Sequence, residues 1–249
     1  IFADVPVLRY SYSLSRSDEA HRSRKFSFEN PCVIKLNDTT WRMYFNVVFL
    51  IDNNFEFPEG ITTISKNVLT ASGVESVTIP DSVIEIQQGA FYNCSKLISI
   101  QLPESITILG AEAFSSCSKL ENINIPAGVT AIPSSIFMNT ALKEIIIPEG
   151  VVSIGNQAFY CCDFSEIVLP ESITSIGNYA FYSCGNLTKV IISDSVETIG
   201  EFAFQSCQKI TQLSIGKGVK SIGSYAFSYC YGLTEVVIPG NVESINLRA

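Results

Sequence analysis

The sequence has very few of the side chains on which most catalytic and metal sites depend. Its 249 residues include a single histidine, His21, and only 16% of them are charged. A Cys/His or Ser/His hydrolase would have to use His21, which lies in a polar stretch, 15–24, with no nucleophile motif beside it. We therefore interpret His21 as a solvated side chain. P-loop and G-x-G-x-x-G motifs are missing as well, so we predict a non-enzymatic protein with no catalytic residue and no cofactor.

Long apolar runs and an excess of positive charge are also missing. Although 47% of the residues are apolar, the longest candidate run, 44–51, has only the length of a strand. A membrane-spanning helix needs about 20 apolar residues, so we predict no direct membrane insertion. The net charge of −8 argues against nucleic acid, because phosphates are bound by clustered Lys and Arg. The start of the chain does not have the pattern of an export signal, so export cannot be read directly from it.

What the sequence does have is a unit of about 23 residues that repeats to its end. The consecutive units 164–186, 187–209 and 210–232 read FSEIVLPESITSIGNYAFYSCGN, LTKVIISDSVETIGEFAFQSCQK and ITQLSIGKGVKSIGSYAFSYCYG. Full units begin at Val74, Leu97, Leu120, Leu142, Phe164, Leu187 and Ile210, after a degenerate coil over 52–73 and before an incomplete one from 233. One unit cannot bury its own apolar face, so the units must stack to build a core.

The opening segment of each unit has the pattern of a β-strand. In the unit 187–209 the apolar residues Leu187, Val190 and Ile192 are predicted to point inward, with the period of two that is typical of a strand. β-Branched residues, which favour strands, dominate the segment. Proline at the seventh position ends this strand, because it cannot extend a ladder. These prolines are Pro80, Pro103, Pro126, Pro148, Pro170 and Pro239. The sequence therefore predicts one parallel strand per coil.

The rest of each unit is predicted to turn and return. The apolar residues that fill the core there are Val196, Ile199, Ala203 and Phe204 in the unit 187–209. A glycine recurs after the Ile, at Gly155, Gly177, Gly200 and Gly223. We expect a turn with φ above zero at these glycines and a short helical turn in the return segment.

This pattern of residues resembles the BspA-like leucine-rich repeats, also called the Treponema pallidum type, of surface proteins in mucosal bacteria and protozoa. The resemblance covers about four-fifths of the chain. It implies a leucine-rich repeat solenoid, a right-handed α/β-type superhelix with a parallel β-sheet on its concave face and short helical turns and loops on its convex face. It also implies a surface or secreted, adhesin-like protein whose partner is a protein such as host extracellular matrix. The ligand itself does not follow from family membership.

Some units depart from the consensus. Ser193 and Gly216 replace the strand-ending proline, and Pro133, Ile136 and Thr140 replace the Gly, Ala and Cys of the third full unit, which we expect to bend differently. Residues 1–51 do not match the repeat. Their strand-like runs, Val7–Ser13, Lys25–Phe28 and Met43–Ile51, predict a small β-rich N-terminal cap, followed by the repeat domain over 52–249.

Six of the eight cysteines share one repeat position, three residues after the core Phe. They are Cys94, Cys117, Cys162, Cys184, Cys207 and Cys230. Stacked coils give parallel side-chain vectors, whereas disulfides need converging Cβ atoms and zinc needs ligands clustered around a point. We predict reduced core thiols and no metal site, with Cys32 and Cys161 outside the ladder. Acidic residues also share one position, after the Pro, as an exposed rim: Asp81, Glu104, Glu149, Glu171 and Asp194.

The third and fifth positions of each strand are predicted to point away from the core, onto the concave face. At the fifth position the polar Thr78, Gln101 and Asn124 give way to apolar residues in the C-terminal half. The candidate protein-binding residues there are Glu144, Ile146, Glu166, Val168, Lys189, Ile191, Gln212, Glu235 and Val237. An exposed apolar stripe rimmed by charge is typical of a protein interface, but β-branched residues also suit a crowded parallel sheet.

Two further alternatives stay open at this point. The aromatic residues Tyr179, Phe202 and Tyr225 share the sixteenth position and could bind a glycan, or simply pack against neighbouring coils. The chain could also be a scaffold segment of a larger surface protein without a ligand of its own. Homo-oligomerisation, through the concave face or the C-terminal end, is compatible with either.

Overall fold

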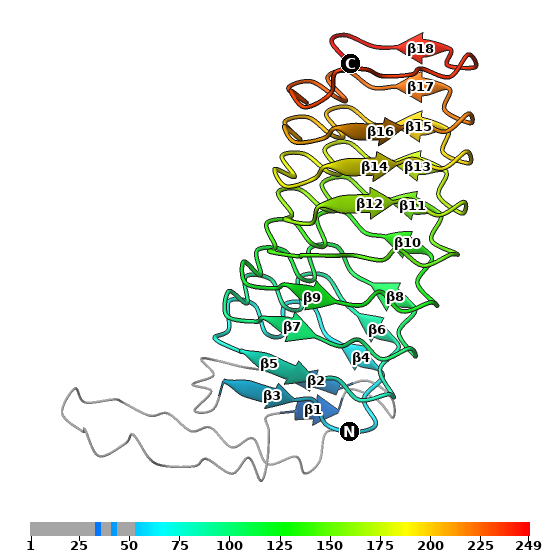
Figure 1. The fold of residues 1–249 in the computed structure, drawn as a ribbon. Coiled ribbons are helices and arrows are strands. Elements are labelled where there is room, and N and C mark those ends of the chain that lie inside the picture. Colours follow the sequence, from blue (N-terminus) through cyan, green and yellow to red (C-terminus); the bar gives the residue numbers. More distant parts are fainter. Residues whose placement is uncertain (1–32, 36–40, 44–52) are drawn as a thin grey trace, which may run out of the picture.

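The repeat region forms a parallel β-solenoid (Figure 1). The computed structural model describes residues 33–35, 41–43 and 53–249. Strands β1 (Val33–Lys35) and β2 (Trp41–Met43) form an antiparallel pair, in which Ile34 lies opposite Arg42. The predicted strands Val7–Ser13 and Lys25–Phe28 lie outside the described residues, as does most of Met43–Ile51. The cap as a unit therefore stays a prediction.

The predicted strand at the start of the coil is confirmed in seven coils, whose strands form the first strand row, but not in the coils that begin at Leu142 and Leu233. Its members are β3 (Asn54–Glu56), β5 (Ser76–Thr78), β7 (Ser99–Ile100), β9 (Asn122–Ile123), β12 (Glu166–Val168), β14 (Lys189–Ile191) and β16 (Gln212–Ser214). They pair in parallel within the groups β3-β5, β7-β9 and β12-β14-β16. The register is one coil per step, with Ile167 beside Val190 and Val190 beside Leu213. Equivalent repeat positions therefore line up along the solenoid.

A second strand row follows the proline turn and was not predicted. Its members are β4 (Thr63–Ile64), β6 (Glu85–Ile86), β8 (Ile108–Leu109), β10 (Ala131–Ile132), β11 (Ser153–Ile154), β13 (Ser175–Ile176), β15 (Thr198–Ile199), β17 (Ser221–Ile222) and β18 (Ser244–Ile245). These strands pair in parallel as β4-β6-β8 and β10-β11-β13-β15-β17-β18. Each has only two residues, which is too short to show the alternation that identifies a strand in sequence.

The return segments are not confirmed as short helical turns. Within the described ranges the structure contains no helix. Backbone hydrogen bonds instead join each return segment to the next coil, such as Phe181 N–H to Ala203 O at 2.7 Å and Ser183 N–H to Gln205 O at 2.8 Å. Two residues per segment have positive φ, for example Phe202 at 57° and Ser206 at 63°. The return segments thus add a third hydrogen-bonded ladder to the two strand rows.

The prediction of positive φ at the recurring glycines was wrong. Gly155, Gly177, Gly200 and Gly223 are not among the residues with positive φ. A Cβ atom on Gly200 would instead lie 2.6 Å from the carbonyl carbon of Gly177 and 2.7 Å from the backbone nitrogen of Asn178. Glycine is needed here because adjacent coils approach too closely for any side chain.

The core consists of ladders of like residues, one from each coil. Phe159, Phe181 and Phe204 are fully buried and stack with ring centroids 5.3 and 4.9 Å apart. The ladder of predicted core cysteines lies beside them, and the structure adds a polar role for its thiols. Cys184 Sγ donates a hydrogen bond to Phe159 O at 3.1 Å, and Cys207 Sγ donates to Phe181 O at 3.0 Å. The cysteines thus fill space and also satisfy buried carbonyls.

Both strand rows are interrupted next to the third full unit, 120–141, and the first row is also interrupted between β5 and β7. The different bend expected for this unit stays a prediction. Strands β8 and β10 are not paired with each other, nor are β9 and β12, and the coil 142–163 has no first-row strand. Ile136 is nevertheless fully buried in place of Ala. Thr140 is buried in place of Cys, and its hydroxyl donates a hydrogen bond to Phe137 O at 2.8 Å. The buried core therefore continues through this unit, although the pairing of strands in both rows is interrupted beside it.

Candidate protein-binding face

The outward side chains of the first strand row, together with those at the equivalent positions of the coils 142–163 and 233–249, lie on one face, which we call the first-strand face. Strand β12 shows how it arises, because Ile167 is buried while Glu166 and Val168 on either side are exposed. The same alternation places Ile145 and Ile147 in the core and Ile146 in solvent. The predicted candidate residues at the third and fifth positions are therefore brought together on one face.

An apolar stripe runs along the C-terminal half of this face. Its residues are Ile146, Val168, Ile191 and Val237. Ile146 is 81% exposed, Val168 53% and Val237 74%, and Ile191 is half-buried. Val168 lies beside Ile191 in the strand register, and Ile191 lies beside Ser214. Each coil thus contributes one fifth-position residue to this row, and Ser214 is the polar residue that interrupts the apolar stripe.

The N-terminal half of the face is polar at the same positions. Thr78 and Gln101 are exposed there. The side chain of Asn124 binds the adjacent coil, with Leu102 N–H donating to its Oδ1 at 2.7 Å and its Nδ2 donating to Leu102 O at 2.8 Å. The fifth position therefore does not require an apolar side chain for coils to stack.

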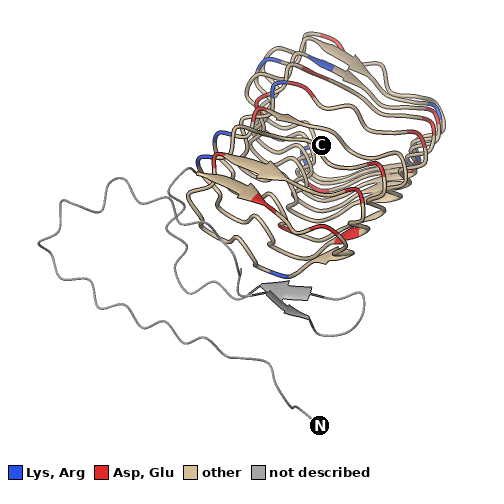
Figure 2. Cartoon of the chain, turned by 90° about the horizontal axis from the view of Figure 1, so that it is seen from below, with Lys and Arg blue, Asp and Glu red and all other residues tan. Residues whose placement is uncertain are grey.

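Charged residues flank the apolar stripe on both sides. At the third position Glu144, Glu166 and Glu235 are exposed, and Lys189 forms an ion pair with Glu166 at 3.0 Å. Such an exposed pair contributes little stability. Beyond the strand ends lies the acidic rim. In Figure 2, red segments recur along the side where the first strands end.

The rim residues are exposed as predicted, and some of them also tie coils together. Asp194 Oδ1 accepts a hydrogen bond from Lys217 N–H at 2.8 Å. Glu171 Oε2 accepts one from the Ser195 hydroxyl at 3.1 Å. The stripe therefore lies between two rows of side chains in which carboxylates predominate.

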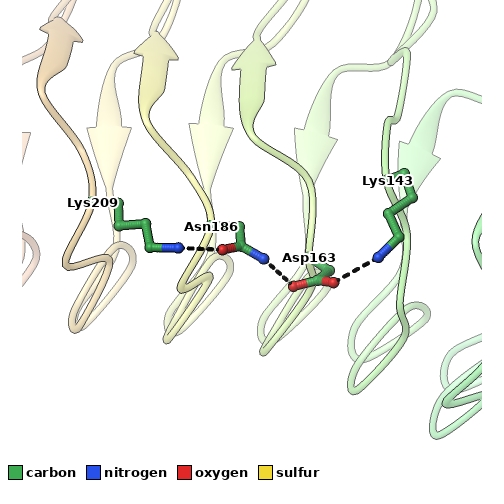
Figure 3. A network of polar contacts seen from close by, with 4 residues as sticks. All are labelled: Lys143, Asp163, Asn186 and Lys209. Atoms are coloured by element: carbon green, nitrogen blue, oxygen red, sulfur yellow. Dashed lines mark hydrogen bonds and ion pairs between the residues drawn. The ribbon is translucent and has the colours of Figure 1, made fainter.

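A polar network that the sequence did not reveal crosses the coils at their ends (Figure 3). Lys143 Nζ contacts Asp163 Oδ2 at 2.9 Å, Asn186 Nδ2 donates to Asp163 Oδ1 at 2.6 Å, and Lys209 Nζ donates to Asn186 Oδ1 at 2.6 Å. The hydrogen bond from Lys143 lowers the pKa of the Asp163 carboxyl below its usual value, and the same bond raises the pKa of Lys143. The network links three successive coils beside the first-strand face.

The aromatic residues of the sixteenth position form a stack of their own. The ring centroids of Tyr179 and Phe202 are 4.6 Å apart, and those of Phe202 and Tyr225 are 5.0 Å apart, with interplanar angles of 8° and 4°. The Arg248 guanidinium lies 5.9 Å from the centroid of the Tyr225 ring. A sugar stacks on an open ring face, and the facing sides of these rings cover one another. This geometry favours packing between coils over a glycan platform.

The cysteines of the described repeat ladder are buried, and burial raises the pKa of most of their thiols. A hydrogen bond with Cys117 lowers the pKa of Cys94, but the Cys94 thiol is fully buried. Burial raises the pKa of the Cys162 thiol to about 12 and that of Cys230 to about 12. Cys161, outside the ladder, is half-buried, and burial raises its pKa as well. No group of three or more His, Cys, Asp or Glu suited to a metal occurs in this part of the chain. His21 and Cys32 lie outside the described residues, so the interpretations of both stay predictions.

Comparisons with known proteins identify the repeat. Residues 49–162 and 152–249 match the family model of the BspA type leucine rich repeat region, in six copies. No match was found among curated proteins. In the part of the chain that the structure describes, no helix is long and apolar enough to cross a membrane.

Several solved structures share the fold. A leucine-rich repeat protein from Bacteroides ovatus is 30% identical with a TM-score of 0.69, over 88% of this chain and 54% of that one. A leucine rich cell surface protein from Faecalibacterium prausnitzii is 26% identical with a TM-score of 0.52, over 76% of this chain and 54% of that one. The leucine rich repeat protein of T. pallidum is 29% identical with a TM-score of 0.54, over 61% of this chain and 72% of that one. The chain thus spans about half the length of the first two.

Proposed function

Because this chain belongs to the BspA-type leucine-rich repeat family, we propose that it is a non-enzymatic, adhesin-like protein, secreted or exposed at the cell surface. Its first-strand face binds a protein partner, such as a host extracellular-matrix protein. The observation that carries this proposal is the apolar stripe, whose member Ile146 is 81% exposed. The similarity to a protein named as a cell surface protein supports the location.

The stripe is better explained by binding than by sheet packing. Thr78, Gln101 and Asn124 occupy the same position in coils that also stack, so stacking does not require an apolar residue there. Ile146 belongs to no strand, so β-propensity does not account for it either. Water contact with apolar surface is unfavourable by roughly 25 cal/mol per Å². A row of such residues rimmed by charge has the composition of a protein interface.

The proposal is tested with the double variant Val168→Arg/Ile191→Arg. Wild type and variant are applied to arrays of matrix proteins and glycans, and circular dichroism checks that both are folded. The matched control is Thr78→Arg/Gln101→Arg, which places the same two charges on the polar half of the same face. We expect a protein ligand to be bound by wild type and control but not by the stripe variant. Equal binding by all three proteins would exclude the stripe as the site.

The same array examines the glycan alternative. If Tyr179→Ala/Phe202→Ala abolished binding to a glycan while the stripe variant retained it, the aromatic stack would be the functional surface. If no ligand were bound by any of the proteins, a scaffold role in a larger surface protein would be favoured.

A further inference from the structure

The partner's shape and charge can be inferred from the first-strand face, given that this face is the binding surface proposed above. We propose that it binds a basic amphipathic α-helix of the partner protein, lying along the solenoid axis. Three observations carry this inference. They are the spacing of the apolar stripe, the carboxylates on both of its sides, and the width between them.

The spacing of the stripe matches one turn of an α-helix. Neighbouring parallel strands lie about 4.8 Å apart, so the five fifth-position residues from Ile146 to Val237 span about 19 Å in four steps. A helix presents one apolar residue per turn of about 5.4 Å, so over four turns it drifts by about 2.4 Å from the stripe. An extended segment presents a same-face residue about every 6.7 Å and drifts by about 7.6 Å, which exceeds a whole coil spacing. Only the helix stays in contact along the stripe.

The charges beside the stripe define the flanks of that helix. In the two coils that begin at Leu142 and Phe164, the third position holds Glu144 and Glu166, and the rim holds Glu149 and Glu171. All four are exposed, and the nearby lysines Lys143 and Lys189 are already paired with Asp163 and Glu166. A partner with acidic flanks would be repelled, whereas lysines or arginines would meet carboxylates on both sides.

The width of the face fits as well. The third and fifth positions are two residues apart along a strand, or about 6.7 Å, and the rim is a further three residues along the chain. A helix with its side chains is about 10–12 Å across. With its apolar side over Val168, its two flanks lie above Glu166 on one side and toward Glu171 on the other. Long basic side chains can reach both rows while their stems cover the stripe.

A set of designed peptides tests the inference by fluorescence anisotropy. The first is a helix of about 18 residues, or five turns, with leucine along one stripe and lysine on both flanks. The second has glutamate in place of each lysine. The third has the composition of the first, with leucine and lysine alternating so that it is amphipathic as a strand rather than as a helix. We expect the first to bind at least tenfold more tightly than either other peptide, with a preference that weakens as salt is raised.

Charge reversal on the protein locates the contact. In Glu149→Lys/Glu171→Lys two rim carboxylates beside the stripe are reversed. We expect this variant to bind the lysine-flanked helix about tenfold more weakly and the glutamate-flanked helix more tightly. The control is Asp81→Lys/Glu104→Lys, which makes the same change of charge on the same rim beside the polar half. Each double variant also removes one hydrogen bond to the next coil. The rim variant loses the bond between Glu171 and the Ser195 hydroxyl, and the control loses the bond between Glu104 and Ala127 N–H, so the two variants lose a similar contact. The control should change affinity by less than about threefold.

The helix inference is overturned if the three peptides bind equally, if none binds, if the alternating peptide binds best, or if both rim variants behave alike. These outcomes are separable from failure of the proposed function. A protein ligand lost on Val168→Arg/Ile191→Arg would still place binding on the stripe while excluding a basic helix as the occupant. If that variant kept its ligand, the face itself would be wrong.

Discussion

Replacement of Gly200 by alanine tests directly why glycine recurs after the second strand. The new Cβ would lie 2.6 Å from the Gly177 carbonyl carbon and 2.7 Å from both the backbone nitrogen and the Oδ1 atom of Asn178. These are mainly backbone atoms of the preceding coil, so relief requires that the two coils move apart. Overpacking of this kind costs about 1–3 kcal/mol.

Separation of the coils would also weaken the hydrogen bonds beside the glycine. Gly200 N–H donates to Ile176 O at 2.9 Å, and Glu201 N–H donates to Asn178 Oδ1 at 2.9 Å. At about 1 kcal/mol each, their loss brings the expected destabilisation to about 3–5 kcal/mol. The measurement is urea unfolding followed by circular dichroism, with the slope of the transition compared between variants.

Gly185 provides the matched control, because a Cβ there would meet no atom within 4 Å and its φ is not positive. Gly185→Ala should be neutral, or stabilising by about 0.4–1 kcal/mol through the unfolded chain. The close-approach argument would be refuted if Gly200→Ala changed the free energy of unfolding by no more than Gly185→Ala does.

Three other features of the repeat region give predictions. Phe181→Ala removes a fully buried ring stacked on both neighbours and should lower the free energy of unfolding by about 3–5 kcal/mol in the same urea assay; a loss below about 1 kcal/mol would contradict the stacked core. Folding lowers the pKa of Asp163, so its contribution to the free energy of unfolding is fully present above the unfolded-state pKa of about 3.9. That contribution is lost as the pH falls through the lower pKa of the folded state. Since its side chain is 40% exposed, Asp163→Asn should cost only a few tenths to about 1 kcal/mol at pH 7, and the difference from wild type should shrink in unfolding curves recorded below pH 4. In native protein at pH 8, a thiol reagent should label the half-buried Cys161 well before the fully buried Cys184, whose pKa is raised by burial, as followed by peptide mapping. Equal labelling rates would contradict the burial of the cysteine ladder.

Prediction from sequence succeeded where the repeat position alone decides the outcome. The inward residues of the first strand, such as Ile167 and Val190, and the ladder of Phe and Cys are buried as expected. The outward exposure of Ile146 and Val168 also followed from the alternation of inward and outward positions in the repeat, although Ile146 itself lies in no strand. Their role in binding stays a prediction, because exposure follows from the repeat position whereas affinity depends on a partner.

Prediction failed where the outcome depends on the backbone of an adjacent coil. The φ angle expected at Gly200 was wrong because the nearest atoms to it belong to Gly177 and Asn178, a full coil earlier in the sequence. The second strand row was missed because a pair such as Thr198–Ile199 has one inward residue and no detectable alternation. The network around Asp163 was missed because its four residues come from three coils.

The sequence by itself determined that this protein is a stack of like coils, because a fixed period places the same side chain at the same height in every coil and only stacking buries it. The tertiary structure decided how close the coils come, which return segments bond to one another, and which ring faces are covered. Those properties depend on contacts between residues about 23 positions apart, whose distances no single repeat encodes.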